Sequence, residues 1–454
     1  MCISGLRNGG APLLRSGVIL LTIWVLLIGA PSAGFPTDHP PERGAIPGET
    51  TVDFDQGVRL ALKQSPFLIK SGLEIQLRRL NETDALSDFA PSVTLRTRFF
   101  VNEPTQSGRS NRTYALDFIS ENYNPVAAYF SLQAQKLITR VAVLSHMKVI
   151  AEGLHRLGRS FLELDTLKKI ADCQEEILEL GRKNLVYTEQ RQSQGEGTTL
   201  EVNLSRQELE VARAEKDRLA GAQGRIREAV KSWLGLPPAH KLHFSLKPSR
   251  SQVLGPGDGS PGRMEEAQGR SLDLKMQTLK KELQAYNIML AKAQLLPTLY
   301  MGVQNPDPLS NLDSSGYFVS LGFTFPVWDG FKRVRNVSRQ KIVLRQYEAE
   351  YQEKEMEFSQ KRREALEQLQ TAAAAHKAAL AQVELARLKD RQSEIRYYQG
   401  GEPFSVFLEG KKGLWEAQKN AALKSLEHDL AQLAVRHLSG ELVSRYVDEL
   451  SWQK

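Results

Sequence analysis

Few residues in this sequence combine the types and the spacing that a chemical site requires. Residues 257–262 (GDGSPG) match the glycine pattern of a dinucleotide-binding turn, but prolines surround them and no strand leads into them, which indicates a linker. His240 and His243 lie close together without the cysteines or carboxylates that would complete a metal site. Cys173 lies in a charged helical stretch, and no Ser-His-Asp arrangement accompanies it. We therefore expect no catalytic site, no metal and no cofactor.

The first 34 residues, 1–34, have the features of a secretory signal peptide. Arg7 and Arg15 supply positive charge, residues 18–28 form an apolar run, and residues 30–34 (APSAG) supply small side chains for cleavage. A membrane-spanning helix needs about 20 apolar residues, so this run is too short to be an anchor. The start of the chain therefore predicts export from the cytoplasm.

The mature chain is expected to begin near Ala33 or Phe35. Residues 35–50 are rich in proline and glycine, which predicts a disordered N-terminal segment. Cys2 leaves with the signal peptide and Cys173 remains as a single cysteine, so no disulfide can form within the mature chain. Stability must then come from packing and assembly.

The charge pattern argues against nucleic-acid binding. The chain has 60 Lys and Arg against 53 Asp and Glu, a formal net charge of +7, and the two signs interleave along the sequence. A nucleic-acid-binding protein gathers positive charge and aromatic side chains on one face. Aromatic residues make up only 7% of the chain against 25% charged residues, which favours long solvated helices over a single globular core.

The sequence contains an internal duplication. Residues 90–95 (APSVTL) resemble residues 296–301 (LPTLYM), and their prolines lie 206 positions apart. The same offset relates residues 194–196 (QGE) to residues 400–402 (GGE). Two matches about a hundred residues apart that keep one offset indicate two homologous halves.

Each half is predicted to consist of a helix, two strands, a very long helix, a glycine turn and a second long helix. No proline interrupts residues 141–194 or 332–399, and as helices these runs would span roughly 80 and 100 Å. Apolar positions recur within them at spacings of three and four, as in helices that pack against each other. We therefore expect two long coiled-coil hairpins.

Residues 51–235 form the first predicted repeat and residues 265–450 the second. Residues 236–264 between them are rich in proline, glycine and serine, which predicts an irregular connector.

Four segments show the period-two alternation of a strand with one apolar and one polar face. They are residues 93–101, 128–135, 299–304 and 317–325. Membrane strands are about 9 to 11 residues long and alternate in this way. Four strands are too few to close a barrel, and each unpaired backbone group at a sheet edge in lipid costs several kcal/mol. The membrane interpretation therefore requires several chains to share one barrel.

Several motifs, in this order and spacing, carry a resemblance to a known family. They are a break between helices at 62–66 (LKQSP), a glycine turn at 195–202 (GEGTTLEV), the end of the first half at 233–237 (WLGLP), a strand-to-helix junction at 325–330 (FPVWDG), and a second glycine turn at 398–402 (YQGGE) followed by residues 414–417 (LWEA). Together they resemble the TolC-like outer membrane efflux protein family, from about Thr51 to Leu450.

The resemblance implies a mostly helical fold with a membrane β part. Three identical subunits would each contribute four strands to a twelve-stranded β-barrel, continuous with an α-helical barrel of long coiled-coil hairpins. Such a trimer is a passive duct in the outer membrane of a Gram-negative bacterium and extends into the periplasm. It would contact outer-membrane lipid, a periplasmic adaptor (membrane fusion) protein and an inner-membrane pump, as part of a tripartite efflux or type I secretion system.

The resemblance also assigns local roles. The tip turns would be at Gly195, Gly197, Gly400 and Gly401, and the strand–helix junctions at Pro91, Pro297, Pro326, Asp329 and Gly330.

The expected periplasmic gate departs from the family pattern. Tyr398 matches a gate tyrosine, but the family's carboxylate positions fall on Phe407 and Gly410, with Glu409 beside them and Glu402 at the turn. A ring of carboxylates would favour cations, whereas Phe407 would form an apolar gate. The gate candidates are therefore Tyr398, Glu402, Phe407 and Glu409, and ordinary packing between helices remains an alternative for Tyr398 and Phe407.

The first half departs from the pattern as well. Residues 134–139 (AQKLIT) replace the junction motif of the second half, and residues 102–125 are interpreted as a long extracellular loop.

Two other classes of protein remain open. A periplasmic coiled-coil scaffold or adaptor would share the signal peptide, the long helices and the glycine turns, but not four alternating strands. An envelope enzyme would need a polar constellation in a globular core.

Overall fold

The computed structural model describes residues 49–90, 94–99, 114–237, 239–245, 252–254, 271–305, 318–325 and 327–447. The predicted signal peptide lies outside them, as does most of the segment predicted to be disordered. The last two residues of that segment, Glu49 and Thr50, are in a strand.

The elements follow one another as β1 (Glu49–Val52), α2 (Phe54–Gln64), α3 (Pro66–Ser87), β2 (Thr94–Phe99), β3 (Tyr114–Tyr123), α4 (Pro125–Ser193), α5 (Thr199–Leu234), β4 (Lys241–Phe244), α8 (Leu272–Ala293), β5 (Thr298–Asn305), β6 (Phe318–Thr324), α9 (Lys332–Tyr398), α10 (Phe404–Leu438) and α11 (Glu441–Val447).

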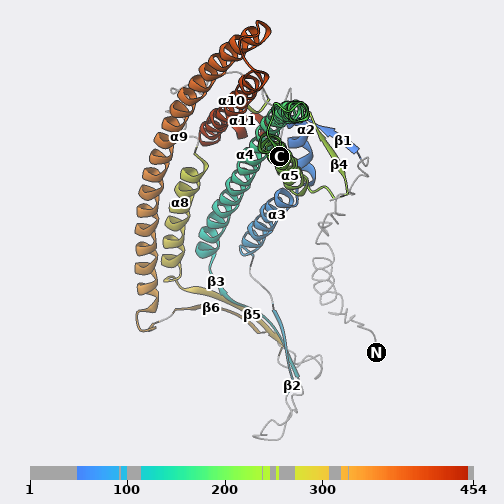
Figure 1. Cartoon of the computed structure of the whole chain (residues 1–454). Coiled ribbons are helices and arrows are strands. Elements are labelled where there is room, and N and C mark those ends of the chain that lie inside the picture. Colours follow the sequence, from blue (N-terminus) through green and yellow to red (C-terminus); the bar gives the residue numbers. More distant parts are fainter. Residues whose placement is uncertain are drawn as a thin grey trace, which may run out of the picture. The chain divides into compact units, whose positions relative to one another are not determined.

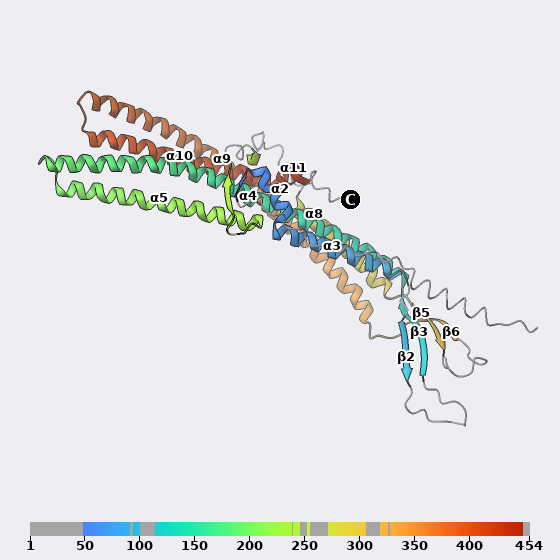
Figure 2. The same ribbon diagram turned by 90° about the vertical axis from the view of Figure 1, so that its right-hand side faces the viewer.

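Two helical hairpins form most of the structure (Figure 2). Helix α4 has 69 residues and α9 has 67, so each is about 100 Å long. Helix α5 packs antiparallel on α4 and α10 on α9, while α4 and α10 join the two hairpins. The prediction of long helices linked by glycine turns is confirmed, although α4 begins earlier than expected, at Pro125.

Nearer the strands, four helices lie side by side in the order α3, α4, α8 and α9 (Figure 1). Helices α3 and α8 both have 22 residues, and both their first and their last residues lie 206 positions apart. The offset found in the sequence thus also relates these two helices. The predicted break before α3 is present, because α2 ends at Gln64 and Pro66 occupies the first turn of α3.

The four longest strands form one antiparallel sheet in the order β2-β3-β5-β6. Leu95 pairs with Phe118, Ile119 with Gly302, and Met301 with Leu321. Strands β1 and β4 form a separate parallel pair, with Val52 opposite Phe244. The connector predicted to be irregular at residues 236–264 therefore contains a strand.

One strand prediction was wrong. Residues 128–135 lie inside helix α4, and the second strand of the first half is β3, in the segment expected to be an extracellular loop. Ala128 and Leu132, four residues apart, satisfy both a two-residue and a helical spacing, and both are buried. Residues 134–139 are therefore not a strand-to-helix junction, and the departure from the family pattern expected there is wrong.

Candidate functional site

The turn between α9 and α10 depends on glycine. Gly400 has φ of 74°, a left-handed conformation that glycine adopts without steric cost. The Gly401 amide donates to the Arg396 carbonyl at 2.8 Å and the Gly400 amide donates to the Tyr397 carbonyl at 3.0 Å. These bonds satisfy carbonyls at the end of α9 and reverse the chain within a few residues. Gly400 and Gly401 therefore lie at the tip of the second hairpin, as expected for a tip turn.

Glu402 is held by its own hairpin. Its carboxylate accepts hydrogen bonds from the Ser393 hydroxyl at 2.9 Å and from the Arg396 guanidinium at 3.0 Å. Arg396, followed by Ser393, lowers the pKa of Glu402. The side chain is thus ionised at neutral pH and ties the start of α10 to the end of α9.

Phe407 lies in a cluster of four rings that joins the two hairpins. Its ring stacks on Tyr397 with centroids 5.0 Å apart and lies 5.9 Å from Phe404, which is 4.8 Å from Tyr187 on α4. Phe407 is only 8% exposed, and the Lys411 ammonium lies over its ring at 5.0 Å. Within one subunit, these contacts correspond to packing between helices, the alternative left open for Phe407.

Tyr398 has the opposite environment. Its side chain is 75% exposed at the last residue of α9, and its ring centroid lies 5.6 Å from that of Tyr397. Glu409 is also exposed, on the first turns of α10. The four gate candidates therefore divide into two side chains that bind their own hairpin, Glu402 and Phe407, and two that remain accessible, Tyr398 and Glu409.

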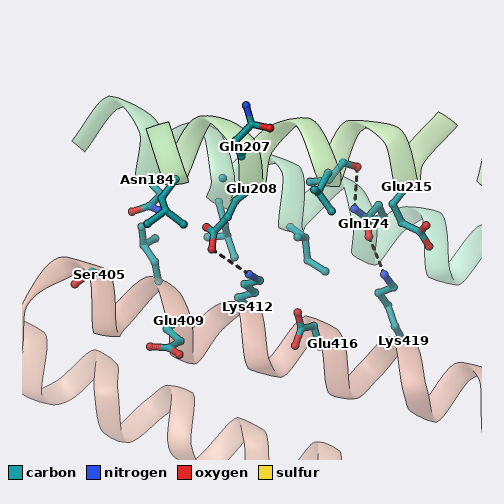
Figure 3. Close-up of a pocket in the computed structure, with 17 residues that line it drawn as sticks. Gln174, Asn184, Gln207, Glu208, Glu215, Ser405, Glu409, Lys412, Glu416 and Lys419 are labelled. Atoms are coloured by element: carbon teal, nitrogen blue, oxygen red, sulfur yellow. Dashed lines mark hydrogen bonds and ion pairs between the residues drawn. The ribbon is translucent and has the colours of Figure 1, made fainter. Parts of the chain in front are cut away.

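A groove of about 650 Å³ lies between the hairpins, next to this tip (Figure 3). Lys412 faces Glu208 across it at 4.0 Å, and Lys419 donates to the Gln174 side chain at 2.8 Å. Glu409 lines the same groove. These are opposed charges without a nucleophile beside a base, so the groove is suited to binding rather than to a reaction.

The tip of the first hairpin is tighter than that of the second. Gly195 has φ of 80°, and the Arg191 carbonyl accepts hydrogen bonds from the amides of Glu196 and Gly197. A Cβ atom at Gly197 would lie 3.0 Å from the Gln192 nitrogen, so the close approach of backbone also requires glycine there. Thr198 then caps α5.

The junction between β6 and α9 turns through two left-handed residues, Gly330 at φ 62° and Phe331 at φ 61°. The Asp329 carboxylate accepts from the Arg333 amide at 3.1 Å, and the Arg333 guanidinium donates to the Gln294 carbonyl at 2.8 Å. Asp329 thus caps the start of α9 and, through Arg333, connects it to the end of α8.

Of the three prolines assigned to junctions, Pro297 separates α8 from β5. Pro91 and Pro326 lie outside the described residues.

The equivalent junction in the first half was not predicted from the sequence. Asn124 precedes Pro125 and caps α4 by accepting from the Ala127 amide at 3.0 Å, while its own amide donates to the Ala293 carbonyl at 3.0 Å. Asn124 therefore connects to the end of α8 as Arg333 does. An asparagine directly before a proline is a signal for a helix start that could have located it.

Strand β6 exposes a continuous apolar row. Val319, Leu321 and Phe323 are 74%, 73% and 72% exposed, and the row continues through Val327 and Trp328 at the junction. In a soluble sheet, large apolar side chains usually face the core. Their exposure on β6 therefore indicates that this surface contacts an apolar environment.

Among the described helices, none is both long enough and apolar enough to cross a membrane.

Within the described part of the chain, no three His, Cys, Asp or Glu side chains are grouped as metal ligands.

Comparison with known proteins extends this picture. Residues 264–441 match the model of the family described as outer membrane efflux protein. Protein CyaE of Bordetella pertussis is 22% identical in an alignment of 438 positions that covers 92% of this chain and 89% of that protein.

Solved structures match with similar coverage. The outer-membrane channel OprN has a TM-score of 0.71 at 17% identity, over 85% of this chain and 89% of that one. The CmeC outer membrane channel of Campylobacter jejuni has a TM-score of 0.71 at 14% identity, over 88% and 89%. With the two hairpins, the glycine tips and the four-stranded sheet, these matches show that the chain has the fold of outer-membrane channels and that residues 264–441 resemble the outer membrane efflux protein family.

Proposed function

We propose that three copies of this chain form a passive duct through the outer membrane and that the chain itself catalyses no reaction. The observation that carries this proposal is the sheet. Within the described residues, β2 and β6 each have a partner strand on one side only, and β6 carries an exposed apolar row. Three such sheets joined edge to edge give a closed twelve-stranded barrel in which every strand is paired, as a lipid environment demands.

The length of the helices indicates where the hairpins extend. Helices of about 100 Å are far longer than a membrane is thick, so α4 and α9 carry the tip turns well away from the sheet. In the proposed assembly they cross the periplasm, where an adaptor protein and an inner-membrane pump engage them and the pump supplies the energy. Tripartite efflux and type I secretion both use this arrangement.

We assign the periplasmic constriction to Tyr398 rather than to Phe407. Tyr398 is exposed at the tip and has space to approach its counterparts around a three-fold axis, whereas Phe407 is occupied by its own ring cluster. Glu402 supports the turn through Arg396, and Glu409 contributes exposed negative charge beside it.

Single-channel conductance of the detergent-extracted protein in a planar bilayer tests both parts of the proposal. Tyr398→Ala should enlarge the conductance steps, because it shortens the side chain that narrows the tip. Gln399→Ala is the matched control, since it shortens an exposed side chain at the next position. Equal steps in wild type and Tyr398→Ala would refute the gate. A protein that forms no channel and is soluble without detergent would refute the duct and favour a periplasmic coiled-coil scaffold.

A further inference from the structure

Among the described helices, those of the row next to the sheet leave the outer faces of α3 and α9 without a partner. In that row α3 contacts α4, and α9 contacts α8, so α3 and α9 are the two outermost helices (Figure 1). They stand on the same sides as the edge strands β2 and β6. If sheets join at these edges, α3 of one copy comes beside α9 of the next.

The outer face of α3 is apolar in its middle and acidic near the sheet. Leu73, Leu77 and Leu80 are 55%, 50% and 52% exposed, and their spacing places them on one side of the helix, opposite Ile75, which is buried. Asp84 continues this row by another four residues, towards the end of the helix. A water-facing helix surface rarely has three leucines in a row, so this face is suited to a protein partner.

Helix α9 carries the complementary charge. Residues 332–347 contain six Lys and Arg and no Asp or Glu. Arg335 and Ile342 are seven positions apart and therefore share one face, on which Ile342 is 58% exposed. Within the described part of the chain, the side chains of Asp84 and Arg335 take part in no ion pair or hydrogen bond.

The two faces match in their distance from the helix ends that lead to the sheet. Asp84 lies three residues before the end of α3 at Ser87, and Arg335 lies three residues after the start of α9 at Lys332, so both are about 4.5 Å along their helices. Leu77 and Ile342 each lie ten residues from the same ends, about 15 Å along. Where antiparallel α3 and α9 pack with these ends aligned, Asp84 therefore meets Arg335 and Leu77 meets Ile342.

We infer that α3 of one copy packs against α9 of the next, with Asp84 paired to Arg335 and the leucine row of α3 against Ile342. The inference rests on the proposed three-copy assembly and names the surface that joins the copies. The partner is a second copy of this chain. An anionic lipid headgroup bound by the basic residues of α9 is the competing occupant, but it would leave the leucine row of α3 unexplained.

Charge reversal and its rescue test this pair in the full-length protein purified from outer membranes. The measured quantity is the temperature at which the trimer dissociates, followed by native electrophoresis and light scattering. Arg335→Asp and Asp84→Arg should each place like charges together and raise the ratio of dissociated to intact trimer about tenfold at the wild-type midpoint, and the double variant should restore most of the lost stability. A positive charge near the end of α3 favours the helix itself, so the loss in Asp84→Arg would belong to the interface.

Lys341→Asp is the matched control. It makes the same charge change on an exposed side chain of α9, but six positions from Arg335 it points about 120° away around the helix. It should leave the dissociation temperature unchanged. The neutral variants Arg335→Gln and Asp84→Asn serve where a reversed charge prevents folding, and each should weaken the trimer less than the reversal.

The outcomes separate the possibilities. The proposed pair would be refuted if the single variants had no effect. It would also be refuted if the double variant lost as much trimer stability as the two single variants together. An intact trimer that loses only its preference for phosphatidylglycerol over phosphatidylcholine in Arg335→Asp would assign the basic face to lipid. A wild-type protein that is monomeric in detergent would refute the three-copy assembly itself.

Discussion

Replacing Phe407 by alanine distinguishes a gate residue from a packing residue. The phenyl ring is 8% exposed and contacts Tyr397, Phe404 and the Lys411 ammonium. Truncation removes all three contacts and leaves a hole between α9 and α10 near the tip, while the turn at Gly400 is untouched. The expected effect is a local loss of stability at the end of the second hairpin.

The magnitude follows from the burial. Substitution of a buried phenylalanine by alanine costs about 3–5 kcal/mol, and the low end applies because the tip is open to solvent and can relax. A loss of about 3 kcal/mol corresponds to roughly a hundredfold change in the opening equilibrium of the tip. Phe407→Leu keeps most of the apolar volume and should lose less than half as much.

Hydrogen exchange measured by mass spectrometry reports this opening directly. Amides of residues 390–410 should lose roughly a hundredfold protection in Phe407→Ala, while the amides around the first tip, near Gly195, change little. Val406→Ala is the control, because Val406 is adjacent but 40% exposed. Unchanged protection together with enlarged conductance steps would mean that Phe407 lines the passage, and the packing assignment would be wrong.

Three further predictions concern other parts of the structure. Gly400→Ala should cost about 1 kcal/mol and lower the unfolding midpoint, because φ of 74° is strained for alanine although its Cβ would meet nothing within 4 Å. Asn124→Ala should cost about 1 kcal/mol in urea unfolding through the lost cap of α4, whereas Asn124→Asp should keep the cap. Burial, followed by the nearby His437, lowers the pKa of His155 to about 4 from 6.5. The unfolded chain therefore binds more protons between these values, so thermal stability should fall as pH drops from 6.5 to 4, and His155→Gln should flatten that dependence.

Local features of the chain were readable from the sequence. The turns at Gly195 and Gly400 could be predicted because a left-handed backbone and a close approach of main chain favour glycine wherever they occur. The long helices could be predicted because residues 332–399 contain no proline and repeat their apolar positions at helical spacing. The 206-residue offset located both halves and holds in helices α3 and α8.

Assignments that depend on neighbours could not be made reliably. Residues 128–135 fit a strand and a helix equally well in isolation, and only the contacts with other helices decide for α4. The strand β3 was missed because its partners, β2 and β5, lie elsewhere in the chain and supply its hydrogen bonds.

The sequence by itself determined the duplicated plan, the hairpins and their turns, because backbone limits and periodicity act over a few residues. Tertiary structure alone decided the roles of individual side chains at the tip. Phe407 turns inward because Tyr397 and Phe404 meet it there, Glu402 binds Arg396 across the turn, and Tyr398 remains exposed. Such orientations follow from packing between α9 and α10 and against Tyr187 of α4, which helical periodicity does not encode.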